Sequence, residues 1–168
     1  MAETLGSVVI ATSGLSLALL VALGLASTRR FGVIVGRRDR LAIQRLFRIA
    51  IVVQGAHFLE ELLTGFAVWF PAVLGQAPWS TEFFVIFNLA WLFIWLAAAA
   101  ALPTGRRWPL APLWFLALAL AGNGVVHPLL ALRAGGYFPG LLTSPLTGLA
   151  GFLLITRLLR STGPGAGP

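Results

Sequence analysis

Three ionisable side chains lie close together inside a long apolar stretch of this chain. His57, Glu60 and Glu61 occur between apolar residues in the segment that runs from Gln54 to Thr64. At about 100° per residue, a helix places these three side chains within one arc of about 100°, and it places Gln54 and Thr64 on the same side. A carboxylate in the middle of a membrane helix costs about 2.5–3.5 kcal/mol on insertion scales. Two carboxylates with a histidine therefore indicate a functional site.

Later apolar runs contain further polar side chains that could meet this stripe. Asn88 lies in one run, and Asn123 and His127 lie four residues apart in another. With a rise of about 1.5 Å per residue across a hydrocarbon layer of about 30 Å, these three side chains and Glu61 are expected at one level, about 8–14 Å below the outer edge. Tyr137 follows in the next loop and is expected to lie above that level, where it would gate the site or contact the substrate.

A metal site is the first chemistry that these residues suggest. Two imidazoles with one or two carboxylates are a common ligand set for Zn²⁺, and also for Fe²⁺ or Mn²⁺. The expected ligands are His57, His127 and either Glu60 or Glu61, and the other glutamate is the expected general acid or base. A di-iron carboxylate site needs about four carboxylates, so two buried glutamates disfavour it.

Three other interpretations stay open. Without a metal, one of two neighbouring carboxylates in an apolar pocket is expected to stay protonated, and it could donate a proton in a lipid isomerase or cyclase. Haem ligation by His57 and His127 is the weaker cofactor alternative, because it leaves both glutamates unexplained. The polar groups could also serve only to hydrogen-bond the helices to one another.

The composition indicates a membrane protein. Hydrophobic residues make up 58% of the 168 residues and charged residues only 10%, which lies outside the range of soluble domains. The net charge of +7 comes from 12 arginines that lie in short segments between the apolar runs, so we predict membrane lipids as partners and no nucleic acid. The chain has no cysteine, which excludes disulfides and thiolate metal sites.

Five apolar runs predict the architecture. Spans of about 20 residues are expected at 5–26, 43–70, 83–102, 110–132 and 141–159, in a single domain of residues 1–160 with a disordered tail, 161–168. With the N-terminus outside and the C-terminus inside, every arginine except Arg133 falls on the inner side, as the positive-inside rule requires. We therefore predict an all-α, multi-pass protein of the cell membrane with five transmembrane helices.

Three segments resemble the motifs of a known family. His57–Glu61 reads HFLEE and resembles the motif that names the HXXEE family of small integral membrane proteins. Asn123–His127 resembles that family's second motif, an asparagine followed four residues later by histidine. Arg133–Thr143 resembles the third, built on Arg, Tyr, Pro-Gly and Thr, with one extra residue between Arg133 and Tyr137. The resemblance implies a membrane enzyme, and it supplies neither substrate nor reaction.

Together these observations predict an integral membrane enzyme, a metal-dependent hydrolase acting on a lipid-like or amphipathic substrate in the outer half of the bilayer. The expected catalytic residues are Glu60, Glu61 and Tyr137. The side chains expected to orient the ligands or the substrate are Asn88, Asn123, Thr64, Thr143 and Arg133. A proton-coupled transporter that uses the Glu60 and Glu61 pair is the alternative from another class, although the chain shows no internal repeat of the kind common in transporters. The oligomeric state cannot be read from the sequence.

Overall fold

The protein is a helical bundle in the computed structural model, which describes residues 12–28, 30–34 and 36–162. Within these ranges the α-helices are α2 (Ser13–Ser27), α3 (Arg37–Thr64), α4 (Phe66–Val73), α5 (Thr81–Ala101), α6 (Leu110–Ala134) and α7 (Ser144–Ser161), and a 3₁₀ turn covers Leu102–Thr104. Across the same ranges the β pairing is limited to one isolated bridge between Ile34 and Thr162. The expected all-α class is confirmed.

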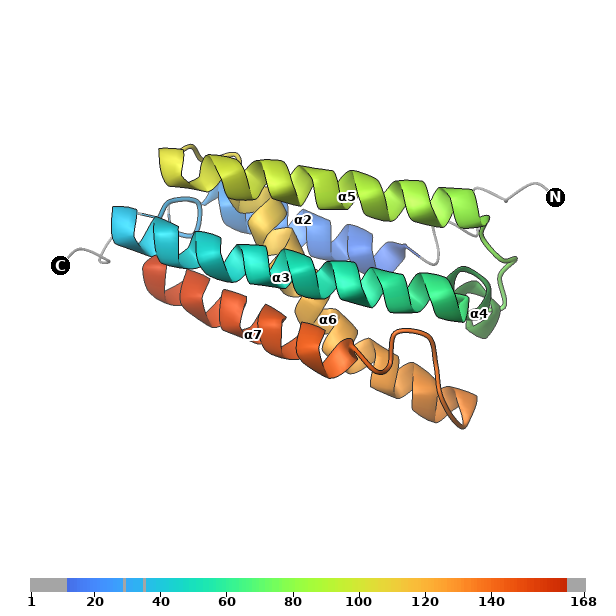
Figure 1. Cartoon of the computed structure of the whole chain (residues 1–168). Coiled ribbons are helices and arrows are strands. Elements are labelled where there is room, and N and C mark those ends of the chain that lie inside the picture. The colour runs from blue at the N-terminus through green and yellow to red at the C-terminus, as the bar shows by residue number, and fades with distance from the viewer. Residues whose placement is uncertain (1–11, 29, 35, 163–168) are drawn as a thin grey trace.

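The five long helices run alternately in opposite directions. In Figure 1, α2, α5 and α7 run from right to left, whereas α3 and α6 run from left to right. The left end holds the end of α2, the start of α3, the start of α6 and the end of α7, and we call it the arginine end. The opposite end, which we call the loop end, holds α4 and the connections 74–80 and 135–143. Of the described arginines, Arg133 belongs to the loop end.

Two helical segments are long and apolar enough to cross a membrane. These segments are Thr81–Thr104 and Leu110–Ala134, and α2 is a shorter apolar helix. The five spans and their orientation therefore stay predictions. Residues 5–11 of the first expected span and residues 163–168 of the expected tail lie outside the described ranges. At the start of that tail, Ser161 ends α7, and Thr162 is buried and pairs with Ile34.

A glycine divides the second expected span. α3 begins at Arg37, before the expected range of 43–70, and it ends at Thr64. Gly65 follows with a φ of +83°, a conformation that glycine adopts without the steric cost of a Cβ atom. The chain turns there and continues as α4, so Phe66 packs against His127 with 5.6 Å between the ring centroids. A single glycine is also tolerated inside helices, and for that reason the apolar run did not reveal this break.

We call the halves of the bundle next to the arginine end and the loop end the arginine half and the loop half. The arginine half is filled by large apolar side chains. Phe47, Leu113, Trp114 and Leu154 are each at most 1% exposed. α6 and α7 approach closely here, because a Cβ atom on Gly151 would meet backbone atoms of Ala117 and Ala121 of α6. Such close backbone contact between helices needs small residues.

Hydrogen bonds fasten the connection between α2 and α3 to this end. The indole Nε1 of Trp114 donates to the Phe31 carbonyl at 3.2 Å, and Nε of Arg107 donates to the Gly32 carbonyl at 3.1 Å. An ion pair of 2.7 Å joins Arg157 of α7 to Asp39 of α3. The arginine half thus holds α3, α6 and α7 in fixed register, and these are the elements that carry the polar residues of the loop half.

Candidate metal centre

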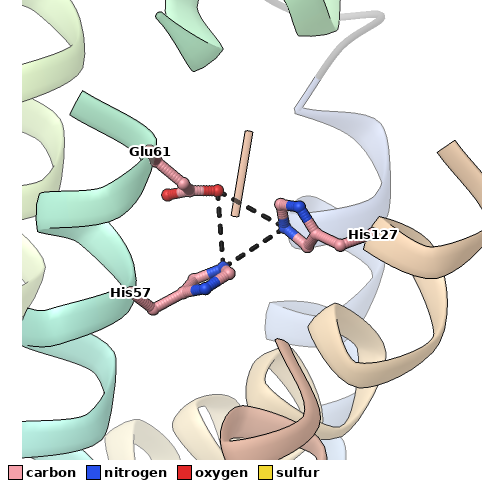
Figure 2. Close-up of side chains that lie close together, drawn as sticks. All are labelled: His57, Glu61 and His127. Carbon is pink, nitrogen blue, oxygen red and sulfur yellow. Dashed lines mark hydrogen bonds and ion pairs between the residues drawn. The ribbon is translucent and has the colours of Figure 1, made fainter. Parts of the chain in front are cut away.

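Two histidines and one glutamate form a buried triangle. His57 and Glu61 lie one turn apart on α3, and His127 projects toward them from α6 (Figure 2). Nε2 of His57 is 3.2 Å from Nε2 of His127, and Oε1 of Glu61 is 3.5 Å from the first nitrogen and 3.4 Å from the second. The three residues are 0%, 2% and 6% exposed, so bulk water does not solvate these atoms.

The second nitrogen of His57 is held by Thr143, at the N-terminus of α7. Nδ1 of His57 lies 2.7 Å from the Thr143 hydroxyl, and this hydroxyl donates its proton to the Glu60 carboxylate at 2.5 Å. A hydroxyl has one proton, so Thr143 must accept the proton on Nδ1 of His57. In the neutral ring, Nε2 of His57 then carries a lone pair that points into the triangle.

The second nitrogen of His127 is held by the connection between α6 and α7. Nδ1 of His127 lies 2.7 Å from the Pro139 carbonyl oxygen, which can only accept a hydrogen bond. Nδ1 therefore carries the proton of the neutral ring, and Nε2 carries a lone pair. Gly140 follows with a φ of +88°, and a Cβ atom there would overlap the rings of both His127 and His57. A residue without a side chain is needed to bring this connection so close to the imidazoles.

Three electron-pair donors thus converge on one point. Two imidazole lone pairs and a carboxylate oxygen repel one another at these distances unless a cation or a shared proton lies between them. The spacing suits a metal ion: ligand distances of about 2.0–2.1 Å in tetrahedral geometry separate the ligand atoms by about 3.3 Å. His57, Glu61 and His127 form a group that could hold a metal ion. Both histidines also bond a fixed acceptor through the other ring nitrogen, as metal-ligating histidines commonly do.

Glu60 binds the 135–143 connection through its carboxylate. Its Oε1 accepts hydrogen bonds from the Tyr137 hydroxyl at 2.7 Å and from the Leu142 N–H at 2.9 Å, and its Oε2 accepts from the N–H and the hydroxyl of Thr143. Partial burial and the bond to Glu60 raise the pKa of Tyr137, so the phenol stays protonated and keeps donating. Glu60 is thereby linked to His57 through Thr143, and this link fixes the orientation of the imidazole.

A cavity of about 480 Å³ adjoins the triangle. Glu61 and His127 form part of its wall, and α2, α4, α5 and α6 supply further lining residues. Many of the lining residues are aromatic, among them Phe66, Trp79, Trp91, Trp95 and Phe115. This volume lies within the range of about 300–1,000 Å³ that is typical of small-molecule sites.

The remaining predicted site residues fall into three positions. Asn88 and Asn123 line the cavity, and Nδ2 of Asn88 donates to the Phe84 carbonyl at 2.9 Å. Thr64 donates to the Glu60 backbone carbonyl at 2.7 Å and is also hydrogen-bonded to Tyr137, so it belongs to the Glu60 side of α3. Arg133 is exposed at the end of α6, and within the described ranges it makes no contact with the triangle.

Sequence reasoning did not assign roles to four residues of this region. Pro139 and Gly140 hold and contact the imidazoles, and Phe66 packs on His127. Gln54 was placed on the polar side of its helix, and the structure shows that it lines the cavity, where its buried Oε1 has no hydrogen-bond partner among the described residues. The Pro-Gly pair inside the third motif was the available signal for the first two, whereas nothing in the sequence marked Phe66.

Comparison with known proteins agrees with the motifs. A family model described as "Protein of unknown function with HXXEE motif" matches residues 48–155. Searches of curated proteins and of solved structures give no match. The matched segment covers more than half of the chain, and it contains all three residues of the triangle together with the 135–143 connection that orients them. The chain belongs to the HXXEE-motif family of proteins of unknown function.

Proposed function

We propose that this protein is an integral membrane enzyme that binds a divalent metal ion at His57, Glu61 and His127 and hydrolyses a lipid-like substrate. The convergence of two imidazole lone pairs and a carboxylate oxygen at 3.2–3.5 Å carries this proposal. Each donor atom is fixed by its own helix or by a second hydrogen bond, so the ligand geometry is organised before an ion arrives. Zn²⁺ fits a set of two nitrogens and one oxygen, and Fe²⁺ or Mn²⁺ accept the same set.

The surface of the bundle supports a location in the membrane. Large apolar side chains are exposed on every long helix, among them Leu20, Val52, Phe93, Leu132 and Phe152. Exposed apolar area of this extent is unusual for a soluble monomer and suits contact with lipid tails. Thr81–Thr104 and Leu110–Ala134 are long enough to span a bilayer, and the arginines of the opposite end suit the cytoplasmic side.

Each residue of the site has a defined part in such a reaction. Bound metal would polarise a substrate carbonyl and lower the pKa of a bound water near neutrality. Three protein ligands leave a fourth position, and because Glu61 and His127 line the cavity, a substrate there can reach it. The second carboxylate oxygen of Glu61 lies outside the triangle and is available to accept a proton. Glu60 acts as a positioning residue, because Thr143 transmits its hydrogen bond to His57.

The alternatives receive less support from the geometry. A shared proton would relieve the repulsion between two of the three donor atoms, which keeps metal-free acid–base catalysis as the second candidate. Haem fits poorly, since the two imidazoles lie 3.2 Å apart with a carboxylate beside them and leave no space for a porphyrin. A transporter needs a path to both ends of the bundle, and the filled arginine half, with Trp114 and Leu113 fully buried, disfavours one.

Metal content of the purified protein tests this proposal. We expect about one equivalent of a divalent metal in wild type after growth in metal-replete medium, and loss of the metal in His57→Ala, His127→Ala and Glu61→Gln. Glu60→Gln should keep the site but weaken affinity about 10–100-fold, as is typical when a group that orients a ligand is removed. Glu82→Gln, in the first turn of α5 and outside the triangle, is the matched acidic control and should bind like wild type.

Metal-free wild-type protein that also fails to bind added Zn²⁺, Fe²⁺ or Mn²⁺ would overturn the metal site and favour the acid–base alternative. Equal metal content in wild type and in all three triangle variants would show that the ion binds elsewhere. Circular dichroism on each sample checks that the helices are retained, so that loss of metal is not confused with loss of the fold.

A further inference from the structure

The cavity beside the triangle contains buried polar atoms that lack partners. Oε1 of Gln54 and the indole Nε1 atoms of Trp79 and Trp95 are buried and make no hydrogen bond in the described part of the chain, and all three residues line the cavity. Gln54 is 7% exposed and Trp95 is 4% exposed. An unsatisfied buried polar atom costs about 1–3 kcal/mol, so Oε1 of Gln54 indicates a ligand group that donates a hydrogen bond to it.

Three amide side chains lie at one height along the cavity. α3 and α5 run in opposite directions and touch at two heights. Gln44 of α3 bonds the Ala99 carbonyl of α5, and Phe58 of α3 contacts Phe84 of α5. Gln54 lies between the two contacts on α3, and Asn88 lies between them at the same height on α5. On α6, which runs in the same direction as α3, Asn123 precedes His127 by one turn, as Gln54 precedes His57. One turn is about 5 Å, so this group of amides lies about 5 Å from the triangle.

The charges around the cavity select against an anionic ligand. None of the described residues that line it is an arginine or a lysine, and its one ionisable acid is Glu61. A phosphate or carboxylate head group would therefore be buried without a cation of the protein and beside a glutamate. The size limits the ligand as well, because about 480 Å³ holds about 16 groups of the size of a water molecule. One hydrocarbon chain fits this space, and a two-chain phospholipid does not.

We propose that the cavity binds an uncharged amphiphile with a single hydrocarbon chain, whose hydroxyl or amide group contacts Gln54, Asn88 and Asn123. The chain then lies against the rings of Trp91 and Phe115, which line the cavity beyond the amides. A bond next to this polar group lies within reach of Glu61 and His127. The class of ligand follows from the cavity alone, whereas its role as the substrate rests on the proposed function.

Tryptophan quenching by brominated chains tests the proposal in the full-length protein in detergent. The probes are 11-bromoundecan-1-ol and 11-bromoundecanoate at pH 8, which share one chain, fit the volume of the cavity and differ in the head group. In protein stripped of metal with a chelator, where no bound ion can attract the carboxylate, we expect saturable quenching by the alcohol and affinity at least ten-fold lower for the carboxylate. Gln54→Leu should weaken alcohol binding about 3–10-fold, because one hydrogen bond is lost. Gln44→Leu removes a glutamine of similar burial from the same helix outside the cavity, and it should bind like wild type.

Gly122→Leu is the sharpest variant, because a Cβ atom at Gly122 meets no atom within 4 Å and the residue lines the cavity. The leucine should fill the space and weaken alcohol binding at least ten-fold. Gly24→Leu, at an exposed and equally open position of α2, is its control. Equal affinity for alcohol and carboxylate, or unchanged binding in Gly122→Leu, would overturn the proposal.

Metal content measured on the same samples separates the two proposals. Alcohol binding that persists in metal-free His57→Ala, which leaves the cavity lining intact, would support the cavity ligand independently of the enzyme. Stoichiometric metal in wild type without saturable quenching by the alcohol would overturn the cavity ligand and leave the metal site standing.

Discussion

The two halves of the bundle are built on opposite principles. In the arginine half, Phe47, Trp114 and Leu158 are at most 1% exposed, and hydrogen bonds to backbone carbonyls fasten the connection between α2 and α3. In the loop half, a cavity of about 480 Å³ begins beside the triangle and extends toward Trp95 and Phe115, and buried polar atoms such as Oε1 of Gln54 have no partner in the described part of the chain. Empty space and unsatisfied polar atoms both lower stability.

This difference separates the part of the bundle that supplies stability from the part that carries the candidate site. The filled half supplies the packing energy that holds α3, α6 and α7 together. The other half gives up packing where the lone pairs of His57 and His127 converge, and it devotes a whole connection, residues 135–143, to orienting them. Variants that disturb one half should therefore affect metal binding and stability in different proportions.

The largest effect is expected from Gly140→Ala in the loop half. The new Cβ atom would overlap the rings of His127 and His57, and the φ of +88° is unfavourable for alanine. We expect metal affinity to fall at least 100-fold, measured by competition with a chromophoric chelator. Gly135→Ala is the matched control, because Gly135 also has a positive φ of +71° but open space around its Cβ position. It should lose only about 1–2 kcal/mol of stability and keep its metal.

Equal metal affinity in these two variants would contradict the close contact between Gly140 and the imidazoles. In that case the connection does not hold the histidines, and the contrast between the two halves would rest on the cavity alone.

A comparable effect, on stability this time, is expected from Gly151→Leu at the contact of α6 and α7. Its side chain would meet backbone atoms of Ala117 and Ala121, which cannot move without separating the helices. Overpacking of this kind costs about 1–3 kcal/mol. Thermal unfolding followed by circular dichroism should show a clear drop in Tm, while metal content at low temperature stays near one equivalent. Gly122→Leu, on the cavity side of α6, should leave the Tm unchanged or raised.

The sequence revealed the helices and the triangle but not what orients them. Alternation of apolar runs with arginine-rich segments predicted an all-α chain, and one polar stripe with Asn123 and His127 predicted which side chains meet. The sequence did not distinguish the role of Glu60 from that of Glu61, because both fall on the same side of a helix within about 100°. Their different roles depend on the 135–143 connection, which covers Glu60 and leaves Glu61 facing His127.

Tyr137 illustrates the same limit. Its place in the loop above the site suggested contact with the substrate, which stays a prediction. In the structure its hydroxyl donates to Glu60 at 2.7 Å, and it is not among the residues that line the cavity. The cavity itself depends on how α2, α4 and α5 approach α6, and hydrophobic patterns carry no information about such packing gaps. The sequence also did not predict that Gly65 ends α3, because this glycine lies inside an apolar run.

Tyr137→Phe should have a smaller effect than either glycine variant. It removes one of the four hydrogen bonds that Glu60 accepts from the 135–143 connection. Because Tyr137 is partly exposed, we expect the free energy of unfolding to fall by only about 1 kcal/mol. Metal affinity should fall less than ten-fold, because Thr143 still joins Glu60 to His57. Unfolding followed by circular dichroism measures the loss of stability, and metal titration measures the affinity. A loss as large as that of His57→Ala would instead place the phenol in the reaction, as the sequence suggested.

The smallest effect is expected from Arg157→Ala at the arginine end. The Arg157 side chain forms an ion pair of 2.7 Å with Asp39, but both side chains are partly exposed, at 42% and 33%. Water and salt screen such pairs, and they contribute about 0–1 kcal/mol. The Tm should shift by no more than a few degrees, less in 0.5 M salt, and metal affinity should not change. A measurable loss of metal would mean that the register of α3 and α7, set at this end, is transmitted along the helices to Thr143 and His57, and the two halves would then be mechanically coupled rather than independent.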